Sequence, residues 1–112
     1  MIIAVDFDGT IVEHRFPAIG PEKPNALQTL KHLQGQGHKI IIWTCREDSY
    51  IEEMNIWFKE KGFKPDAVNH NFDKKLNFAR HKIYADIYID DRNLGAIIDW
   101  SKIENELKRI KF

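Results

Sequence analysis

Two acidic side chains, Asp6 and Asp8, follow the first apolar run of the chain. Residues 1–5 are largely apolar and include β-branched side chains, which predicts a short strand buried on both faces. Side chains two positions apart on a strand point the same way, so both carboxylates are expected at the carboxyl end of this strand, where open α/β sheets bind ligands. Two like charges beside an apolar strand favour a positive partner, and oxygen-only ligands favour Mg²⁺. The alternative is an ordinary turn, because Asp and Gly are common turn residues.

Polar side chains also follow two later apolar runs. Thr44 and Arg46 come at the end of the second run, and Asp90 and Asp91 come at the end of the third. The carboxyl ends of parallel strands share one edge of a sheet, so we expect these groups in one crevice with the first acidic pair. Carboxylates around a cation, with a hydroxyl and basic groups nearby, suit attack on a phosphate monoester.

The elements that position these groups alternate along the chain. Strands are predicted at residues 1–5, 38–43 and 83–89, and helices from Pro24 to Gly35, from Ser49 to a stop at Gly62, and from Ser101 to Ile110. Three further segments carry weaker patterns: a short strand at residues 95–98, a loop or short strand at 65–69, and a loop with one helical turn at 69–81. Alternating strands and helices predict a parallel sheet with right-handed crossovers and helices on both faces.

Two of the predicted helices begin with a possible capping motif. Ser49 with Glu52, and Ser101 with Glu104, have the spacing of capping boxes, in which a serine and an acidic side chain bind each other's backbone N–H groups. These pairs predict where the second and third helices start.

Length and composition limit the class of protein. With 112 residues, 43% of them hydrophobic, the chain is expected to be a single domain over residues 1–112. Its 17 basic side chains balance 17 acidic ones, so bulk charge disfavours a nucleic-acid partner. The single cysteine, Cys45, excludes an internal disulfide. Without a membrane-length apolar run or a signal-peptide core, the protein is expected to be soluble and cytoplasmic, with no membrane partner.

The order of four features resembles the haloacid dehalogenase-like (HAD) superfamily of phosphohydrolases. These features are the motif Asp-x-Asp-x-Thr at residues 6–10, Thr44, Lys82 and the acidic pair at residues 90–91. The resemblance spans residues 6–91, and Asp-Asp-Arg at its end is similar to the nucleotidase and polynucleotide phosphatase branches. It implies a three-layer α/β sandwich with a mostly parallel central sheet, a HAD-like Rossmannoid fold. The gaps between the motifs are short, so no cap domain is expected.

The resemblance implies four catalytic residues. Asp6 would be the nucleophile that forms an aspartyl-phosphate. Asp8 would be the general acid for the leaving group and then the general base for water. Thr44 would hydrogen-bond the transferring phosphoryl group, and Lys82 would neutralise it and hold Asp6 in place.

The same resemblance implies a Mg²⁺ site formed by Asp6, Asp8, Asp90 and Asp91, with Asp8 contributing its backbone carbonyl. Adjacent positions on a strand point in opposite directions. We therefore expect one of Asp90 and Asp91 to be a direct metal ligand and the other a supporting hydrogen-bond acceptor, with the choice between them open.

Phosphate and substrate contacts are expected from Thr10, Thr44, Arg46 and Lys82. Arg46 is assigned by its position at a strand end, and an ordinary surface arginine is the alternative. Lys82 competes for its role with Lys74-Lys75.

Together these features predict a phosphoric monoester hydrolase: a Mg²⁺-dependent phosphatase acting through an aspartyl-phosphate. The expected substrate is a phosphorylated small molecule, with nucleotides and sugar phosphates both open and a nucleic-acid end disfavoured. An uncapped site excludes water poorly. Either a bulky substrate or a neighbouring subunit in a homo-oligomer is expected to cover it.

Two alternatives belong to other functional classes. A phospho-accepting receiver-like signalling domain has similar length and residue types, but in receivers the acidic pair ends the first strand and the acceptor Asp ends the third. Here the order is reversed, which favours the enzyme. A non-catalytic HAD-fold binding protein is the other alternative, and the presence of every required side chain argues against it.

Overall fold

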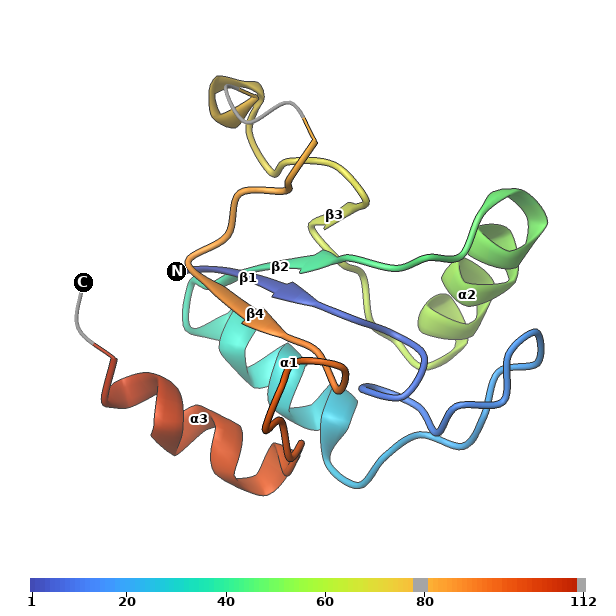
Figure 1. Cartoon of the computed structure of the whole chain (residues 1–112), viewed down its shortest axis with the longest axis horizontal. Helices are drawn as coiled ribbons and strands as arrows, with labels where there is room; N and C mark the ends of the chain where they lie inside the picture. The colour runs from blue at the N-terminus through green and yellow to red at the C-terminus, as the bar shows by residue number, and fades with distance from the viewer. Residues whose placement is uncertain (78–80, 111–112) are drawn as a thin grey trace.

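The computed structural model describes residues 1–77 and 81–110. In this part of the chain, one all-parallel sheet has the strand order β3-β2-β1-β4 and contains β1 (Ile2–Val5), β2 (Lys39–Ile42), β3 (Ala67–Val68) and β4 (Ile87–Ile89). The same residues form the helices α1 (Ala26–Gly35), α2 (Asp48–Glu60) and α3 (Trp100–Lys108) and a single 3-10 helix, η1 (Lys74–Leu76). The predicted α/β class is confirmed, and the layers follow a Rossmann-like three-layer arrangement (Figure 1).

β1 lies inside the sheet because it is apolar on both faces. Ile3, Ala4 and Val5 are only 0%, 2% and 0% exposed. β2 pairs with one side of β1 and β4 with the other. The chain moves outward from β1 to β2 and β3 and later returns to β4 on the opposite side of β1, which is a topological switch point. The carboxyl end of β1 therefore lies between the carboxyl ends of β2 and β4.

The two faces of the sheet are covered unequally. Ile3 shares one core cluster with Leu30 of α1, Phe58 of α2 and Leu107 of α3, so all three α-helices pack on one face. The opposite face carries a smaller cluster formed by Ile41, Ala67 and Ile83. There the connection from β3 to β4, with η1 as the expected helical turn, forms the outer layer in place of a full helix among the described residues (Figure 1). Residues 78–80 of the predicted 69–81 segment lie outside the described residues.

Both predicted capping boxes are wrong. α2 begins at Asp48, and no side-chain hydrogen bond caps its start. α3 begins at Trp100, and the side chain of Asp99 accepts a hydrogen bond from the Ser101 backbone N–H at 3.1 Å. Each helix starts before the serine that was expected to cap it, so Ser49 and Ser101 lie within the first turn. Among the described residues, no helix is both long enough and apolar enough to cross a membrane.

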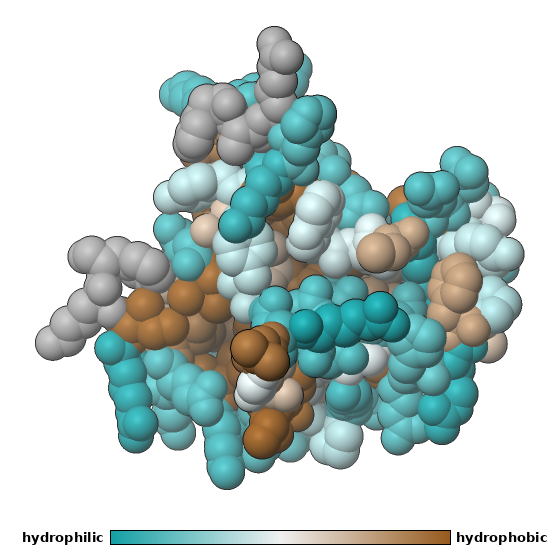
Figure 2. Space-filling view, viewed as in Figure 1, coloured by the Kyte–Doolittle hydropathy of each residue, from teal (hydrophilic) through white to brown (hydrophobic). Residues whose placement is uncertain are grey.

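The chain around β4 is less extended than predicted. β4 covers only the end of the 83–89 segment, and residues 95–98 do not form a strand. Gly95 has a φ of +77°, a conformation that suits glycine and turns the chain out of an extended path. Leu94 and Ile97 are consequently 106% and 90% exposed, and hydrophobic surface gathers around the loop between β4 and α3 in Figure 2.

Candidate active site

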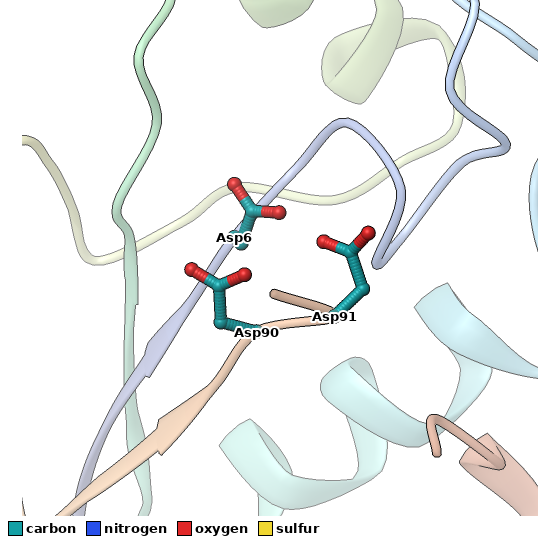
Figure 3. A group of neighbouring side chains, drawn as sticks. All are labelled: Asp6, Asp90 and Asp91. Atoms are coloured by element: carbon teal, nitrogen blue, oxygen red, sulfur yellow. The ribbon is translucent and has the colours of Figure 1, made fainter. Parts of the chain in front are cut away.

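Three carboxylates from neighbouring strands converge at the carboxyl edge of the sheet. Asp6 follows β1, Asp90 and Asp91 follow β4, and one oxygen of each lies within 4.8 Å of the others. Figure 3 shows the three side chains, here named the carboxylate cluster, gathered around one space. Strand alternation was expected to separate Asp90 from Asp91. β4 ends at Ile89, however, so alternation does not apply beyond it, and both side chains reach the cluster.

The carboxylate cluster concentrates negative charge. Burial raises the pKa of Asp6 from 3.8 to about 7, with further upward contributions from the charge of Asp90 and the hydrogen bond to Asp91, while the Thr10 hydrogen bond opposes the rise. Like charges that share one site disfavour ionisation in this way. A donor set made of carboxylate oxygens with this excess of negative charge fits a hard divalent cation such as Mg²⁺.

The turn after β1 determines how closely Asp91 approaches Asp6. Gly9 has a φ of +90°, and a Cβ at this position would lie 2.4 Å from Asp91 Oδ2, so the close approach requires glycine. The buried Thr10 hydroxyl lies 3.0 Å from Asp6 Oδ2 and 3.2 Å from Asp91 Oδ1, and it accepts the Asp91 N–H at 3.0 Å. Trp100 of α3 holds the Thr10 carbonyl with an indole hydrogen bond of 2.8 Å. Thr10, a predicted phosphate contact, therefore joins the two sides of the cluster.

Asp8 stands apart from the carboxylate cluster because Arg46 holds both of its oxygens. The guanidinium donates from Nε at 2.8 Å and from Nη2 at 2.9 Å, and the Arg46 side chain is only 1% exposed. Its Cζ lies 5.3 Å from the ring centroid of Phe7 and 5.1 Å from that of Phe16. The guanidinium also donates to the Ala18 carbonyl at 3.1 Å. A contact between Arg46 and a substrate phosphate stays a prediction, because these groups already engage the guanidinium.

Thr44 is held at the end of β2 by Asn69, a residue that sequence reasoning missed. The Thr44 N–H donates to Asn69 Oδ1 at 2.8 Å, and Asn69 Nδ2 donates to the Thr44 carbonyl at 2.9 Å. Asn69 comes directly after β3 and has a φ of +57°, which asparagine adopts more readily than most residues. An asparagine at a predicted strand end was therefore the available signal.

A cavity of about 280 Å³ opens beside the carboxylate cluster. The predicted site residues in its lining are Asp6, Asp8, Thr44, Arg46 and Asp90. A second hollow of about 370 Å³ shares Asp6 and Asp90 and is lined on another side by Lys82. The Lys82 ammonium lies 4.9 Å from the centroid of the Tyr88 ring. The predicted catalytic side chains thus line two adjoining hollows at one edge of the sheet.

The fold and this acidic edge define an α/β protein, and part of its sequence is similar to that of a protein named as a nucleotidase. Over 40 residues, the chain is 42% identical to a Bacillus cereus protein named "Putative nucleotidase". The match covers 36% of this chain and 21% of that protein, so the chain spans about a fifth of the length of this curated relative. No protein-family model matches the chain.

A solved structure covers the whole chain. It is that of a conserved protein from Bacteroides thetaiotaomicron, with 45% sequence identity, a TM-score of 0.91, and coverage of 100% of this chain and 93% of that one. At this identity and coverage, the chain belongs to the same family as the Bacteroides protein. The likeness confirms the fold, whereas membership of the HAD superfamily stays a prediction.

Proposed function

We propose that the protein is a Mg²⁺-dependent phosphatase that hydrolyses a phosphate monoester through an aspartyl-phosphate on Asp6. The observation that carries this proposal is the convergence of Asp6, Asp90 and Asp91 beside a cavity that also contains Asp8 and Thr44. The similarity to a protein named as a nucleotidase supports a phosphorylated small molecule as the substrate.

The proposed reaction has two displacements at phosphorus. A carboxylate oxygen of Asp6 attacks phosphorus, and the bond from phosphorus to the leaving oxygen breaks. Asp8 gives a proton to the departing oxygen and later removes one from water, which attacks the aspartyl-phosphate, frees phosphate and restores Asp6. Both Asp8 oxygens accept hydrogen bonds from Arg46, so proton donation requires at least one of these bonds to open.

The other polar groups stabilise the transferring phosphoryl group. Thr44 would donate a hydrogen bond to it, and Lys82, which lines a hollow with Asp6, would add positive charge. Four groups would hold Mg²⁺: the side chains of Asp6, Asp90 and Asp91, and the backbone carbonyl of Asp8. When bound, the cation would neutralise the carboxylates and offset negative charge on the phosphate.

Hydrolysis of an aryl phosphate, followed with and without Mg²⁺, tests this proposal. Turnover is expected only with the cation, and Asp6→Asn should abolish it. Asp66→Asn is the matched control, because Asp66 lies at the opposite edge of the sheet, where its Oδ2 accepts the Ile40 N–H at 2.8 Å. Turnover by Asp6→Asn at the wild-type rate, or equal turnover after chelation of divalent cations, would contradict the proposal.

A further inference from the structure

Phe16 lines the cavity beside the carboxylate cluster, and a second aromatic ring, Tyr50, packs against it. Phe16, on the loop before α1, and Tyr50, in α2, meet edge to face with ring centroids 5.2 Å apart and an interplanar angle of 61°. The two residues are 45% and 39% exposed. Aromatic side chains that are this accessible bury little apolar surface in the core, so their contribution to folding stability does not explain their presence at this position.

We propose that Phe16 and Tyr50, the aromatic wall, bind a planar and uncharged part of the leaving group. This makes a nucleoside monophosphate the substrate class of the site. The inference rests on the phosphatase proposed above and goes beyond it, because it assigns specificity to two residues outside the reacting groups.

The position of the aromatic wall follows from the position of the proton donor. The leaving oxygen must come within hydrogen-bond reach of Asp8 to receive its proton. Arg46 binds Asp8 at 2.8 Å and stacks on Phe16, with its Cζ 5.1 Å from the ring centroid. Phe16 and Asp8 also line the same cavity. The group attached to the leaving oxygen is therefore directed toward Phe16.

The space beyond Phe16 is large enough for such a group. The main cavity of about 280 Å³ adjoins a hollow of about 270 Å³, and both are lined by Phe16 and Cys45. Small-molecule sites typically have volumes of about 300–1,000 Å³. Tyr50 lines this 270 Å³ hollow, so the aromatic wall borders the path that leads away from the carboxylate cluster.

The charge of the 270 Å³ hollow selects against a further phosphate. Its lining includes Glu47 and Asp48, both exposed. Two carboxylates in the lining of this hollow repel a polyphosphate or the continuing backbone of a nucleic acid. A nucleobase, in contrast, is uncharged and stacks on aromatic rings. The combination favours a single phosphate joined to a nucleoside.

The test compares nucleotide substrates with a phosphate ester that has no base, within each variant. For wild type and variants, kcat/KM is measured with Mg²⁺ for a purine and a pyrimidine nucleoside monophosphate and for glycerol phosphate, and the ratio of nucleotide to glycerol phosphate is the readout. Phe16→Leu and Tyr50→Ala should each lower this ratio about tenfold, because stacking of one base on an aromatic side chain is worth about 1–3 kcal/mol. Phe16→Trp should keep it within about threefold of wild type, because the ring is retained.

The controls separate this inference from the proposed function. Phe72→Leu removes another exposed aromatic ring, which lies over Lys39 at the amino end of β2, and it should leave the ratio unchanged. An unchanged ratio in both Phe16→Leu and Tyr50→Ala, in an enzyme that Asp6→Asn inactivates, would overturn the aromatic wall and leave the phosphatase standing. Activity of Asp6→Asn on the nucleotides and on glycerol phosphate would overturn the phosphatase mechanism itself. Tyr50→Ala complements Phe16→Leu because Phe16 stacks directly on Arg46, whereas no direct contact joins Tyr50 to Arg46 among the described residues.

Discussion

Aspartates lie at both edges of the sheet, but their surroundings differ. At the amino edge, Asp86 Oδ2 accepts the Ile2 N–H at 2.7 Å, and Asp66 Oδ2 accepts the Ile40 N–H at 2.8 Å. Each of these carboxylates completes the hydrogen bonding of a strand end. At the carboxyl edge, the carboxylate cluster brings three such groups within 4.8 Å. The aspartates at the amino edge thus stabilise the fold, whereas those at the carboxyl edge concentrate negative charge that the fold does not require.

The crowding of carboxylates therefore identifies the site better than residue type does. An aspartate that accepts backbone N–H groups is stabilised by donors that folding supplies. Asp6 instead has its pKa raised by burial and by its acidic neighbours. Such an arrangement costs stability in the folded protein and is expected where a cation or a substrate compensates.

The largest effect is expected for Asp6→Asn. Removing the proposed nucleophile should lower kcat/KM at least about 10³-fold, because no other group forms the covalent intermediate. The thermal midpoint of the metal-free protein should not fall, because the substitution removes one charge from the crowded cluster. Steady-state kinetics and a thermal melt measure the two effects. A large loss of stability with the loss of activity would place Asp6 with the structural aspartates.

A smaller but substantial effect is expected for Arg46→Met. The change leaves Asp8, whose side chain is 13% exposed, without the guanidinium that binds both of its oxygens. Breaking a buried ion pair from one side costs about 3–5 kcal/mol of unfolding free energy, measurable by urea denaturation.

The matched control for Arg46→Met is Arg15→Met. Arg15 pairs with Glu13 at 2.9 Å, but the two side chains are 58% and 50% exposed, so the loss should be at most about 1 kcal/mol. Equal losses of unfolding free energy in Arg46→Met and Arg15→Met would show that the Asp8–Arg46 pair contributes no more than an exposed surface pair.

The origin of the Asp8–Arg46 pair shows the limit of sequence reasoning. The carboxylate cluster could be predicted because chain order and apolar runs are enough to place parallel strand ends at one edge. Alternation also predicted that Asp8 would lie beside Asp6. The strand ends at Val5, however, and the chain turns at Gly9. Asp8 instead pairs with Arg46, which is 38 positions away in the sequence. Pairing at that range depends on how the loops pack, which local periodicity does not encode.

Other errors have equally local causes. The capping boxes matched a pattern of residue types, but both helices start before the serine: Asp99 caps α3 through the Ser101 N–H, and α2 starts without a side-chain cap. Residues 95–98 have apolar, β-branched composition typical of a strand. The turn at Gly95 removes them from the sheet. Asn69 was missed because its contribution is made through hydrogen bonds to Thr44, which a single sequence does not reveal.

At the amino edge, Asp86→Ala should reduce stability and leave catalysis unchanged. The substitution removes the acceptor of the Ile2 N–H, and an unpaired, partly buried donor costs about 1–3 kcal/mol. Urea denaturation measures the loss, and kcat/KM should remain within about twofold of wild type. Asp86→Asn keeps an acceptor oxygen and should recover most of the stability. A loss of kcat/KM in Asp86→Ala comparable to that of Asp6→Asn would remove the distinction between the two edges.

The smallest expected effect is a pH dependence of the metal-free protein. Folding raises the pKa of Asp6 from 3.8 to about 7, so its contribution to stability is present at low pH and is lost as the pH rises through about 7. His38 acts in the opposite direction, because burial and the N-terminal charge lower its pKa. The difference in thermal midpoint between wild type and Asp6→Asn isolates the Asp6 contribution.

Between about pH 5 and about pH 8, the thermal midpoint of wild type should fall relative to that of Asp6→Asn, because only wild type carries the carboxyl that ionises in this range. Added Mg²⁺ should reverse the change at the higher pH, since a cation favours the ionised carboxylate, and it should have a smaller effect on Asp6→Asn. Parallel pH profiles for the two proteins, unaffected by Mg²⁺, would mean that the crowding of the three carboxylates has no energetic consequence. The carboxyl edge would then be no different from the amino edge, where each aspartate is satisfied by the backbone.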